Sequence, residues 1–112
     1  MVIIAIWQII PYNVLMNWNV YFSEKAGKQA KKLNKRVISI LDLLVSDLRN
    51  YGAAPGKGWS NYGKLKGKGK KIDIRHCHLT KGKPTYVCCW EVKIKQREIE
   101  VNYVGTHEKA PY

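Results

Sequence analysis

The stretch TYVCCWEVKIKQREIEVNYV, residues 85–104, carries the pattern that indicates the fold class most clearly. Every second residue of its first half is apolar and lies on a common face: Tyr86, Cys88, Trp90, Val92 and Ile94. The second half alternates in the same way, with Ile99, Val101 and Tyr103 opposed by polar residues. Strict alternation of this kind is typical of β-strands that are buried on one face. Because Gln96 and Arg97 interrupt the pattern, we expect two antiparallel strands, residues 85–95 and 98–104, joined by a tight turn.

Another strand and two helices are predicted before this hairpin. Residues 72–79 form the strand candidate, and residues 80–84 contain the glycine and proline of a turn. Apolar residues recur at helical spacing over residues 24–34 and 36–51, and a short alternating strand precedes them. The order strand, helix, helix and three strands predicts an α+β fold. In that fold, two N-terminal helices cover one face of an antiparallel β-sheet meander.

The length of 112 residues is enough for one domain with a modest core. Residues 1–15 are mostly apolar, and we interpret them as an N-terminal extension to a single domain over residues 16–112. The alternative is that they form an extra strand or an interface segment. The sequence has no run of 18 apolar residues, so no membrane-spanning helix and no membrane partner are expected.

The net charge of +12 points to a polyanionic partner. Residues 49–83 hold ten of the 20 lysines and arginines but only one carboxylate, Asp73. A focused patch of this kind suits a phosphate backbone, because neutralising phosphates releases counterions. The lysines of residues 25–36 are interpreted instead as an ordinary solvated helix face.

The three cysteines, Cys77, Cys88 and Cys89, are odd in number, which favours a reduced, cytoplasmic chain with small buried thiols. A hairpin turn centred on Gly82 would place His76 opposite Cys88 and His78 opposite Tyr86. That grouping invites a zinc interpretation. A structural zinc site takes four ligands in paired spacings, which this segment lacks, so we predict no metal site.

The segment 52–71 is rich in glycine and lysine and is expected to be a loop. Trp59 and Tyr62 lie within it, and we favour packing against the core over stacking on bases for both. In an extended segment Lys64 and Lys66 point the same way and can grip one phosphate, while Leu65 anchors the chain in the core. The alternative for the lysines is a solvated loop.

Near the end of the sequence, His107 is a candidate for proton transfer at neutral pH. Tyr112 can orient a substrate, stack on a base or donate a proton. The alternative for both residues is an unspecialised polar tail.

Three segments in this order resemble the RelE/ParE superfamily of toxins from toxin–antitoxin systems, and a RelE-like translational repressor branch in particular. They are GWSNYGKLKG at residues 58–67, HCHL at 76–79 running on to PTYVCCW at 84–90, and YVGTHEKAPY at 103–112. The resemblance covers about residues 17–112. It implies a RelE-like β-α-α-β-β-β fold and an mRNA endoribonuclease that acts on the ribosome without metal or cofactor. The implied partners are a cognate antitoxin protein, the ribosome and mRNA.

The chemistry that the resemblance implies is attack of a ribose 2′-hydroxyl on the adjacent phosphate. By motif position, Lys64 or Lys66 would activate the 2′-hydroxyl and stabilise charge, His107 would act as general acid, and Tyr112 would orient the substrate. The predicted RNA-binding residues are Lys57, Lys68, Lys70, Lys71, Arg75, His78, Lys81 and Lys83.

The sequence departs from the family pattern in the second meander strand, and it lacks the Leu-Pro break of the helical hairpin, where it has Leu33 and Asn34. It leaves two alternatives for the function. Many RelE-type enzymes carry an arginine early in the second meander strand, where this sequence has Thr85, Tyr86 and Val87, and Arg75 or His78 could stand in for it. The alternatives are a non-catalytic ParE-like gyrase inhibitor and a basic RNA-binding module.

Overall fold

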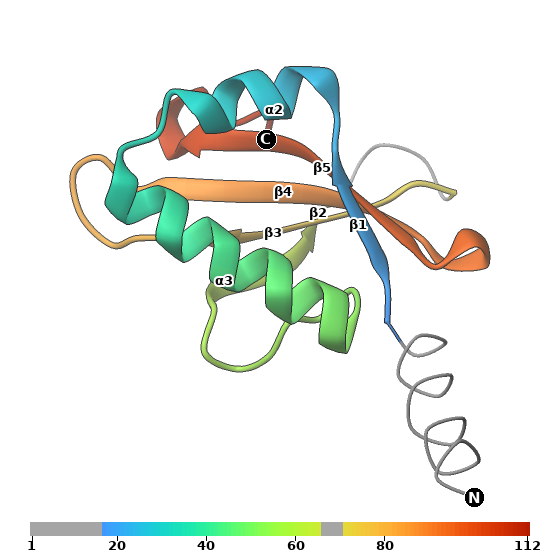
Figure 1. Ribbon diagram of the computed structural model, residues 1–112. Helices are drawn as coiled ribbons and strands as arrows, with labels where there is room; N and C mark the ends of the chain where they lie inside the picture. The colour runs from blue at the N-terminus through green and yellow to red at the C-terminus, as the bar shows by residue number, and fades with distance from the viewer. Residues whose placement is uncertain (1–16, 66–70) are drawn as a thin grey trace, which may run out of the picture.

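A computed structural model describes residues 17–65 and 71–112, which form one five-stranded sheet and two α-helices (Figure 1). The expected extension, residues 1–15, lies outside the described residues. The elements run in the order β1 Asn19–Phe22, α2 Glu24–Lys31, α3 Lys35–Tyr51, β2 Ser60–Leu65, β3 Asp73–His78, β4 Tyr86–Lys93, the 3-10 turn η1 Ile94–Gln96, β5 Glu98–Thr106 and the 3-10 turn η2 His107–Lys109.

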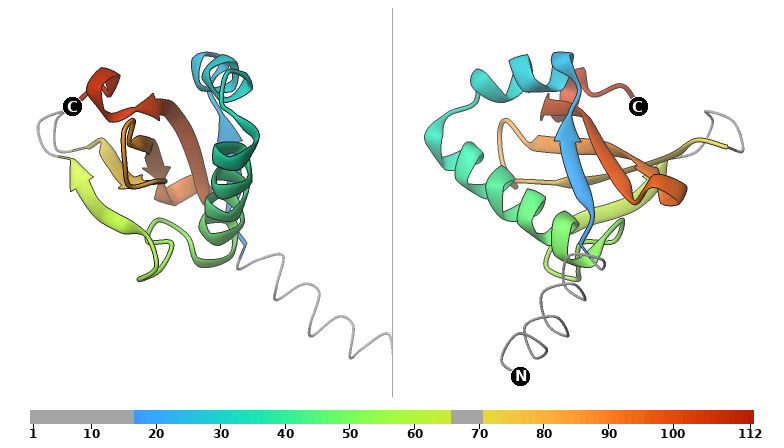
Figure 2. Two further views of the ribbon diagram at one scale, coloured as in Figure 1. Left: turned by 90° about the vertical axis from the view of Figure 1, so that its left-hand side faces the viewer. Right: turned by 45° about the vertical axis from the view of Figure 1, so that its right-hand side comes forward.

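The strands lie in the spatial order β1-β5-β4-β3-β2. Neighbouring strands are antiparallel except for β1, which pairs with β5 in parallel. Both helices lie on one face of the sheet, and the other face, which we call the open face, carries the C-terminal segment (Figure 2). The predicted α+β architecture is confirmed.

Each helix begins at a residue that caps it. The Ser23 hydroxyl accepts a hydrogen bond from the Ala26 amide, and the Asn34 carboxamide oxygen accepts one from the Val37 amide, both at 3.0 Å. Because Asn34 caps α3, the first helix ends at Lys31 instead of continuing to residue 34 as predicted. No helix in the described ranges is long and apolar enough to cross a membrane.

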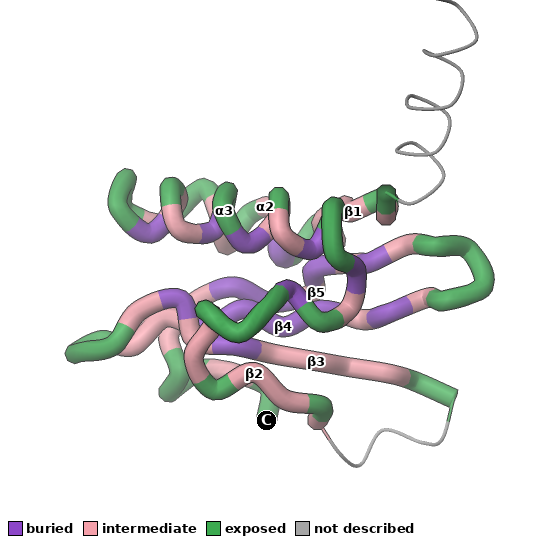
Figure 3. The backbone as a smooth tube through the Cα atoms, turned by 90° about the horizontal axis from the view of Figure 1, so that it is seen from below, coloured by how far each residue is buried: buried purple, intermediate pink, exposed green. Residues whose placement is uncertain are grey.

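The main core lies between the helices and the sheet. Trp90 of β4 is fully buried there against α3, whose stripe contributes Leu44 and Leu48. Trp59 and Tyr62 also pack against this core, as predicted: the Trp59 indole donates a hydrogen bond of 2.8 Å to Asp47, and the Tyr62 ring stacks on Trp90 at 6.2 Å. Figure 3 shows the buried stretches of the helices turned toward the sheet.

A register shift between β4 and β5 divides the apolar residues of β5 between the two faces. Trp90 pairs with Val101 while Cys89 pairs with Tyr103, so Asn102 is an extra residue in β5. From this residue onward, the side chains of β5 alternate between the two faces of the sheet in the opposite phase. The prediction that Tyr103 shares a face with Ile99 and Val101 is therefore wrong: Tyr103 belongs to a second, smaller cluster on the open face, with Val87 and Cys89.

Two further details differ from the sequence predictions. The expected loop 52–71 contains an edge strand, β2, which pairs with β3. Ile94, expected on the buried face of its strand, is 65% exposed because the chain turns into η1 there.

The stability prediction uses two adjacent leucines of α3. Leu44 is fully buried, whereas Leu43 is 63% exposed. We expect Leu44→Ala to lower the free energy of unfolding by about 2–5 kcal/mol, because it removes buried methyl groups and leaves a cavity. Leu43→Ala should change it by no more than about 0.5 kcal/mol. Urea unfolding of both variants checks this, and similar losses would contradict the described orientation of α3.

Candidate active site on the open face of the sheet

Four aromatic rings form a row on the open face. His78 lies against His107 with ring centroids 5.3 Å apart, and His107 lies against Tyr112 at 5.8 Å. Tyr112 in turn lies against His76 at 4.7 Å. The row therefore brings together two residues of β3, one of η2 and one of the C-terminal segment, and we call it the ring row.

The alternation along β3 places its two histidines in this row. Cys77 is fully buried among the residues under the helices, so the flanking residues His76 and His78 face the opposite side. Gly63 of the neighbouring strand pairs with His76, and a Cβ at Gly63 would lie 3.5 Å from His76 Nε2. The small residue in β2 therefore leaves room beside the His76 ring.

Hydrogen bonds at the end of β5 fold the C-terminal segment toward β3. The amide of His107 donates to the carbonyl of Thr85 at 2.8 Å, which attaches η2 to the start of β4. The Tyr103 hydroxyl donates to the carbonyl of Thr106 at 2.7 Å and fixes the corner before His107. These contacts bring His107 and Tyr112 to the histidines of β3.

The surroundings of His76, His78 and Tyr112 favour the neutral forms of these three side chains at neutral pH. Burial, followed by the nearby His78 and His107, lowers the pKa of His76, and burial and then His107 lower the pKa of His78. Burial raises the pKa of Tyr112 to about 12, so its hydroxyl remains a hydrogen-bond donor. The Nδ1 atom of His76 is buried without a hydrogen-bond partner among the described residues.

A hollow of about 640 Å³ opens at the His78 end of the row. Its lining residues include His78, His107, Lys83, Thr85, Thr106 and Glu108. A lysine and two histidines around one hollow offer a cation for a phosphate and two imidazoles suited to proton transfer. We call this feature the histidine hollow.

Of the predicted lysine pair, the structure describes Lys64, and Lys64 is not part of the row. Lys64 pairs with Arg75 across the strands, on the same face as Trp90, and its Nζ lies 4.0 Å from Asp73 Oδ1. Leu65 points the other way and packs against the smaller cluster on the open face. Lys66 lies outside the described residues. The structure thus brings His107 and Tyr112 together but places Lys64 on the other face.

The Arg75 side chain is held by hydrogen bonds to two other side chains. Its guanidinium donates to both carboxylate oxygens of Asp73, at 3.0 and 2.8 Å, and to the Tyr62 hydroxyl at 2.6 Å. The hydrogen bonds from Arg75 lower the pKa of Asp73. Because Arg75 faces away from the ring row, His78 is the better placed of the two candidates to stand in for the missing family arginine.

The other predicted RNA-binding lysines that the structure describes lie before β2, before β3 and in the β3–β4 connection. Lys83 lines the histidine hollow, and Lys81 is exposed in the same β3–β4 connection. Lys57 is exposed before β2, and Lys71 is exposed just before β3. Lys68 and Lys70 fall outside the described residues.

The cysteines are buried free thiols, as expected. Their predicted register was wrong by one residue, since His76 pairs with Cys89 and His78 with Val87. Burial raises the pKa of Cys77 and of Cys89 to about 12, which keeps these thiols protonated. Within residues 17–65 and 71–112, no three His, Cys, Asp or Glu side chains are grouped so that they could hold a metal ion.

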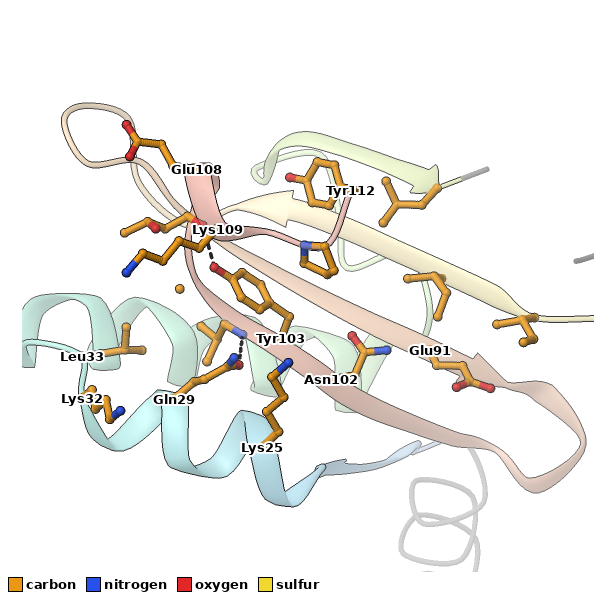
Figure 4. A pocket seen from close by; sticks show the side chains of 17 residues that line it. Lys25, Gln29, Lys32, Leu33, Glu91, Asn102, Tyr103, Glu108, Lys109 and Tyr112 are labelled. Atoms are coloured by element: carbon orange, nitrogen blue, oxygen red, sulfur yellow. Dashed lines mark hydrogen bonds between the residues drawn. The ribbon is translucent and has the colours of Figure 1, made fainter. Parts of the chain in front are cut away.

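A larger groove of about 880 Å³ runs between α2 and the open face (Figure 4). Lysines on its rim come from α2, from the residue after α2 and from the C-terminal segment. Apolar side chains on its floor come from the sheet, from the residue before β3 and from the α2–α3 connection. Gln29 of α2 accepts a hydrogen bond from the Val104 amide at 3.0 Å, at an edge of β5 that β1 does not reach. The rim lysines are Lys25, Lys32 and Lys109, and the floor includes Leu33, Leu65, Ile72, Ile74 and Tyr103.

Sequence reasoning missed this groove. The lysines of α2 follow the ordinary pattern of a solvated helix face, and no motif distinguishes Lys25 and Lys32 from their neighbours. Tyr112 lines the groove as well as belonging to the ring row, so the two features are continuous.

Comparison with solved structures identifies the fold. No protein-family model and no curated protein matches the sequence. The archaeal RelE of Pyrococcus horikoshii, solved as a RelE–RelB complex, matches with a TM-score of 0.67 at 19% identity, over 85% of this chain and 100% of that chain. The isolated Escherichia coli RelE toxin matches with a TM-score of 0.57 at 18% identity, over 84% and 88%. A metal-bound toxin from Helicobacter pylori matches with a TM-score of 0.50 at 18% identity, over 82% and 97%.

These matches agree with the arrangement described above, in which two helices cover one face of a mostly antiparallel sheet. The class is therefore a small α+β domain with its candidate site on the open face. Within that class, the chain has the RelE-like toxin fold, as the sequence predicted.

The lowered histidine pKa values predict how stability depends on pH. In the folded state His76 and His78 bind protons less readily than in the unfolded chain, where their pKa is about 6.5. Their contribution is therefore complete above about pH 6.5 and is lost as the pH falls through the folded values. Asp73 acts in a separate window, because its stabilising effect is lost only below its ordinary pKa of 3.8.

We expect the free energy of unfolding to decrease when the pH is lowered from about 7.5 to about 5.5. His76→Gln should reduce that decrease, because it removes one of the groups that bind a proton on unfolding. Denaturant unfolding at the two pH values measures both quantities. An unchanged pH dependence in His76→Gln would contradict the assigned burial.

Proposed function

We propose that the protein is the toxin of a toxin–antitoxin pair, and that it cleaves mRNA on the ribosome in the cytoplasm. The observation that carries this proposal is the meeting of His78, His107 and Tyr112 beside a lysine-lined hollow on the open face. The proposed reaction is attack of a ribose 2′-hydroxyl on the adjacent phosphate, so the nucleophile belongs to the RNA itself. As proposed, the reaction needs no metal or cofactor.

Each residue at the row has a role in this proposal. His107 donates a proton to the 5′ oxygen as that oxygen leaves the phosphorus. Lys83 lines the same hollow and offsets the negative charge that develops on the phosphate. Tyr112 is 46% exposed, so its ring can contact a base while its other side lies against His76 and His107.

The lysines outside the row have a different role. Lys64 is well exposed, with 63% of its side chain accessible, but it lies on the opposite face from His107. We propose that it contacts ribosomal or messenger phosphates instead of the reacting group, together with Lys57, Lys71 and Lys81. Such contacts add affinity that falls as the salt concentration rises.

The activity is tested by brief induction of the gene followed by primer extension on cellular mRNA. New 5′ ends within translated codons are expected for the wild-type protein. His107→Ala should reduce their yield by about 10²–10⁴-fold, because it removes the proton donor. Lys95→Gln is the control, since Lys95 is exposed in η1 at the β4–β5 connection, away from the ring row.

Two results would contradict the proposed cleavage. One is growth inhibition without new mRNA ends. The other is cleavage that proceeds unchanged in His107→Ala. DNA damage that persists in His107→Ala would favour the ParE-like gyrase inhibitor instead, and harmless overexpression with salt-dependent RNA binding would favour the basic RNA-binding module.

We also propose that an antitoxin protein occupies the groove between α2 and the open face. The P. horikoshii relative in fold was solved together with RelB, which supports a protein partner. The apolar floor and the lysine rim suit an amphipathic segment with acidic residues. Because Tyr112 lines both features, a segment in the groove would also restrict the ring row.

Charge reversal on α2 tests this surface. Lys25→Glu/Lys32→Glu should weaken binding of the protein encoded by the adjacent gene by at least about tenfold, because both lysines line the groove. The matched control is Lys28→Glu/Lys31→Glu, which makes the same change in charge at exposed positions of α2 outside the groove. Titration calorimetry gives both affinities, and equal losses for the two double variants would exclude the groove as the docking surface.

A further inference from the structure

His78 and His107 form a pair of imidazoles from separate elements that share one hollow. His78 comes from the end of β3, and His107 comes from η2 after β5. Their centroids are 5.3 Å apart and their planes are nearly perpendicular, at 72°. Both line the histidine hollow, so groups from two elements can reach one bound phosphodiester.

The proposed cleavage needs a base as well as an acid. The 2′-hydroxyl must lose a proton as it attacks, and the 5′ oxygen must gain one as it leaves. The two oxygens lie on opposite sides of the same phosphorus, only a few bonds apart. Two imidazoles in ring contact, each forming a hydrogen bond of about 2.6–3.2 Å, are well placed to serve one oxygen each.

Three other described groups, Lys64, Tyr112 and His76, are less well placed to be the base. Lys64 lies on the opposite face of the sheet and near Asp73. Tyr112 has its pKa raised to about 12, which disfavours loss of its proton. His76 is separated from the hollow and lies against Tyr112, next to Gly63.

We propose that His78 is the general base of the RNA cleavage reaction, with His107 as its acid partner and Lys83 as the phosphate-binding cation. This assignment rests on the proposed function. It gives a defined catalytic role to a residue that the sequence suggested as an RNA contact or as a stand-in for the missing family arginine. It also places the scissile phosphate in the histidine hollow instead of beside Lys64.

The step balances with these groups alone. Neutral His78 takes the proton of the 2′-hydroxyl while the 2′ oxygen forms a bond to phosphorus. The bond from phosphorus to the 5′ oxygen breaks, and protonated His107 gives its proton to that oxygen. The products are a 2′,3′-cyclic phosphate and a free 5′-hydroxyl, and His78 and His107 then exchange protons with water to return to their starting states.

The electrostatic surroundings agree with the direction of transfer. Burial and the nearby His107 lower the pKa of His78, which favours its neutral form. The charged groups that face the hollow are Lys83 from the β3–β4 connection and Glu108 from η2. The further titratable neighbours along the row are His76 on the same strand and Tyr112 beside His107.

The test compares two variants on two substrates, in single-turnover cleavage on ribosomes programmed with defined mRNA. The variants are His78→Gln and His107→Gln, and the substrates carry either oxygen or sulfur at the 5′ bridging position of the target linkage. A thiolate leaves without protonation, so a sulfur substrate removes the need for an acid but not for a base. Lys95→Gln serves as the control, and a thermal melt checks that each variant is folded.

On the oxygen substrate we expect both histidine variants to lose about 10²–10⁴-fold in rate. On the sulfur substrate His107→Gln should recover to within about tenfold of the wild-type rate, whereas His78→Gln should not recover. The pH profile gives an independent readout. The wild-type rate should fall at low pH as the base is protonated, and His78→Gln should lose that acid limb, which a purely structural role would leave in place.

The outcomes distinguish failure of the proposed mRNA cleavage from failure of the assignment of His78 as its general base. If the wild-type protein does not cut ribosome-bound mRNA, the proposed function fails and the assignment fails with it. If the wild-type protein cuts and His78→Gln keeps its rate within about threefold, only the assignment is overturned. Recovery of His78→Gln on the sulfur substrate would also overturn it, because that behaviour belongs to an acid.

Discussion

The antiparallel register between β3 and β4 is the constraint on which the site depends. Cys77 pairs directly with Cys88, and both are fully buried under the helices. Because side chains alternate along a strand, burying Cys77 forces His76 and His78 onto the open face. A slip of one residue would place the histidines under the helices and the thiol on the surface. The same packing that stabilises the fold therefore decides which residues can reach a substrate.

The other half of the site depends on how β5 ends. Its extra residue, Asn102, changes the phase of the strand, so that Tyr103 faces the open side while Val104 returns to the main core. The hydroxyl of Tyr103 then bonds to the chain just before His107. The bulge in β5 therefore helps to position His107, the candidate catalytic residue that follows this strand.

Much of the fold could be predicted from the sequence, because local patterns specify it. The apolar stripe of α3 and the alternation of β4 each point to one element type and one buried face. The strand β2 could not be predicted in this way, since its lysine and glycine content is typical of a loop. As an edge strand, β2 pairs with a neighbour on one side only. Its Gly63 lies beside the His76 ring, and this contact between two strands is not visible in the local sequence pattern.

The candidate site was predictable in its residue types but not in its geometry. The residue types predicted proton transfer or RNA contact for three members of the site, His107, Tyr112 and His78. Their convergence depends on the hydrogen bond from His107 to Thr85, which joins the residue after β5 to the residue before β4. Lys64 shows the opposite case. Its motif matched the family pattern, but the pairing of β2 with β3 turns it toward Asp73 and away from the rings.

We propose that RNA binds this protein at the ring row on the open face. The most direct measurement is an NMR titration with a short RNA that carries 2′-deoxy sugars and therefore cannot be cleaved, following the ring signals of the histidines and tyrosines. We expect shifts at His78, His107 and Tyr112, and little change at Tyr21, which lies on β1 at the edge of the sheet away from β2 and β3. Shifts at Tyr21 with an unperturbed ring row would contradict binding at the ring row.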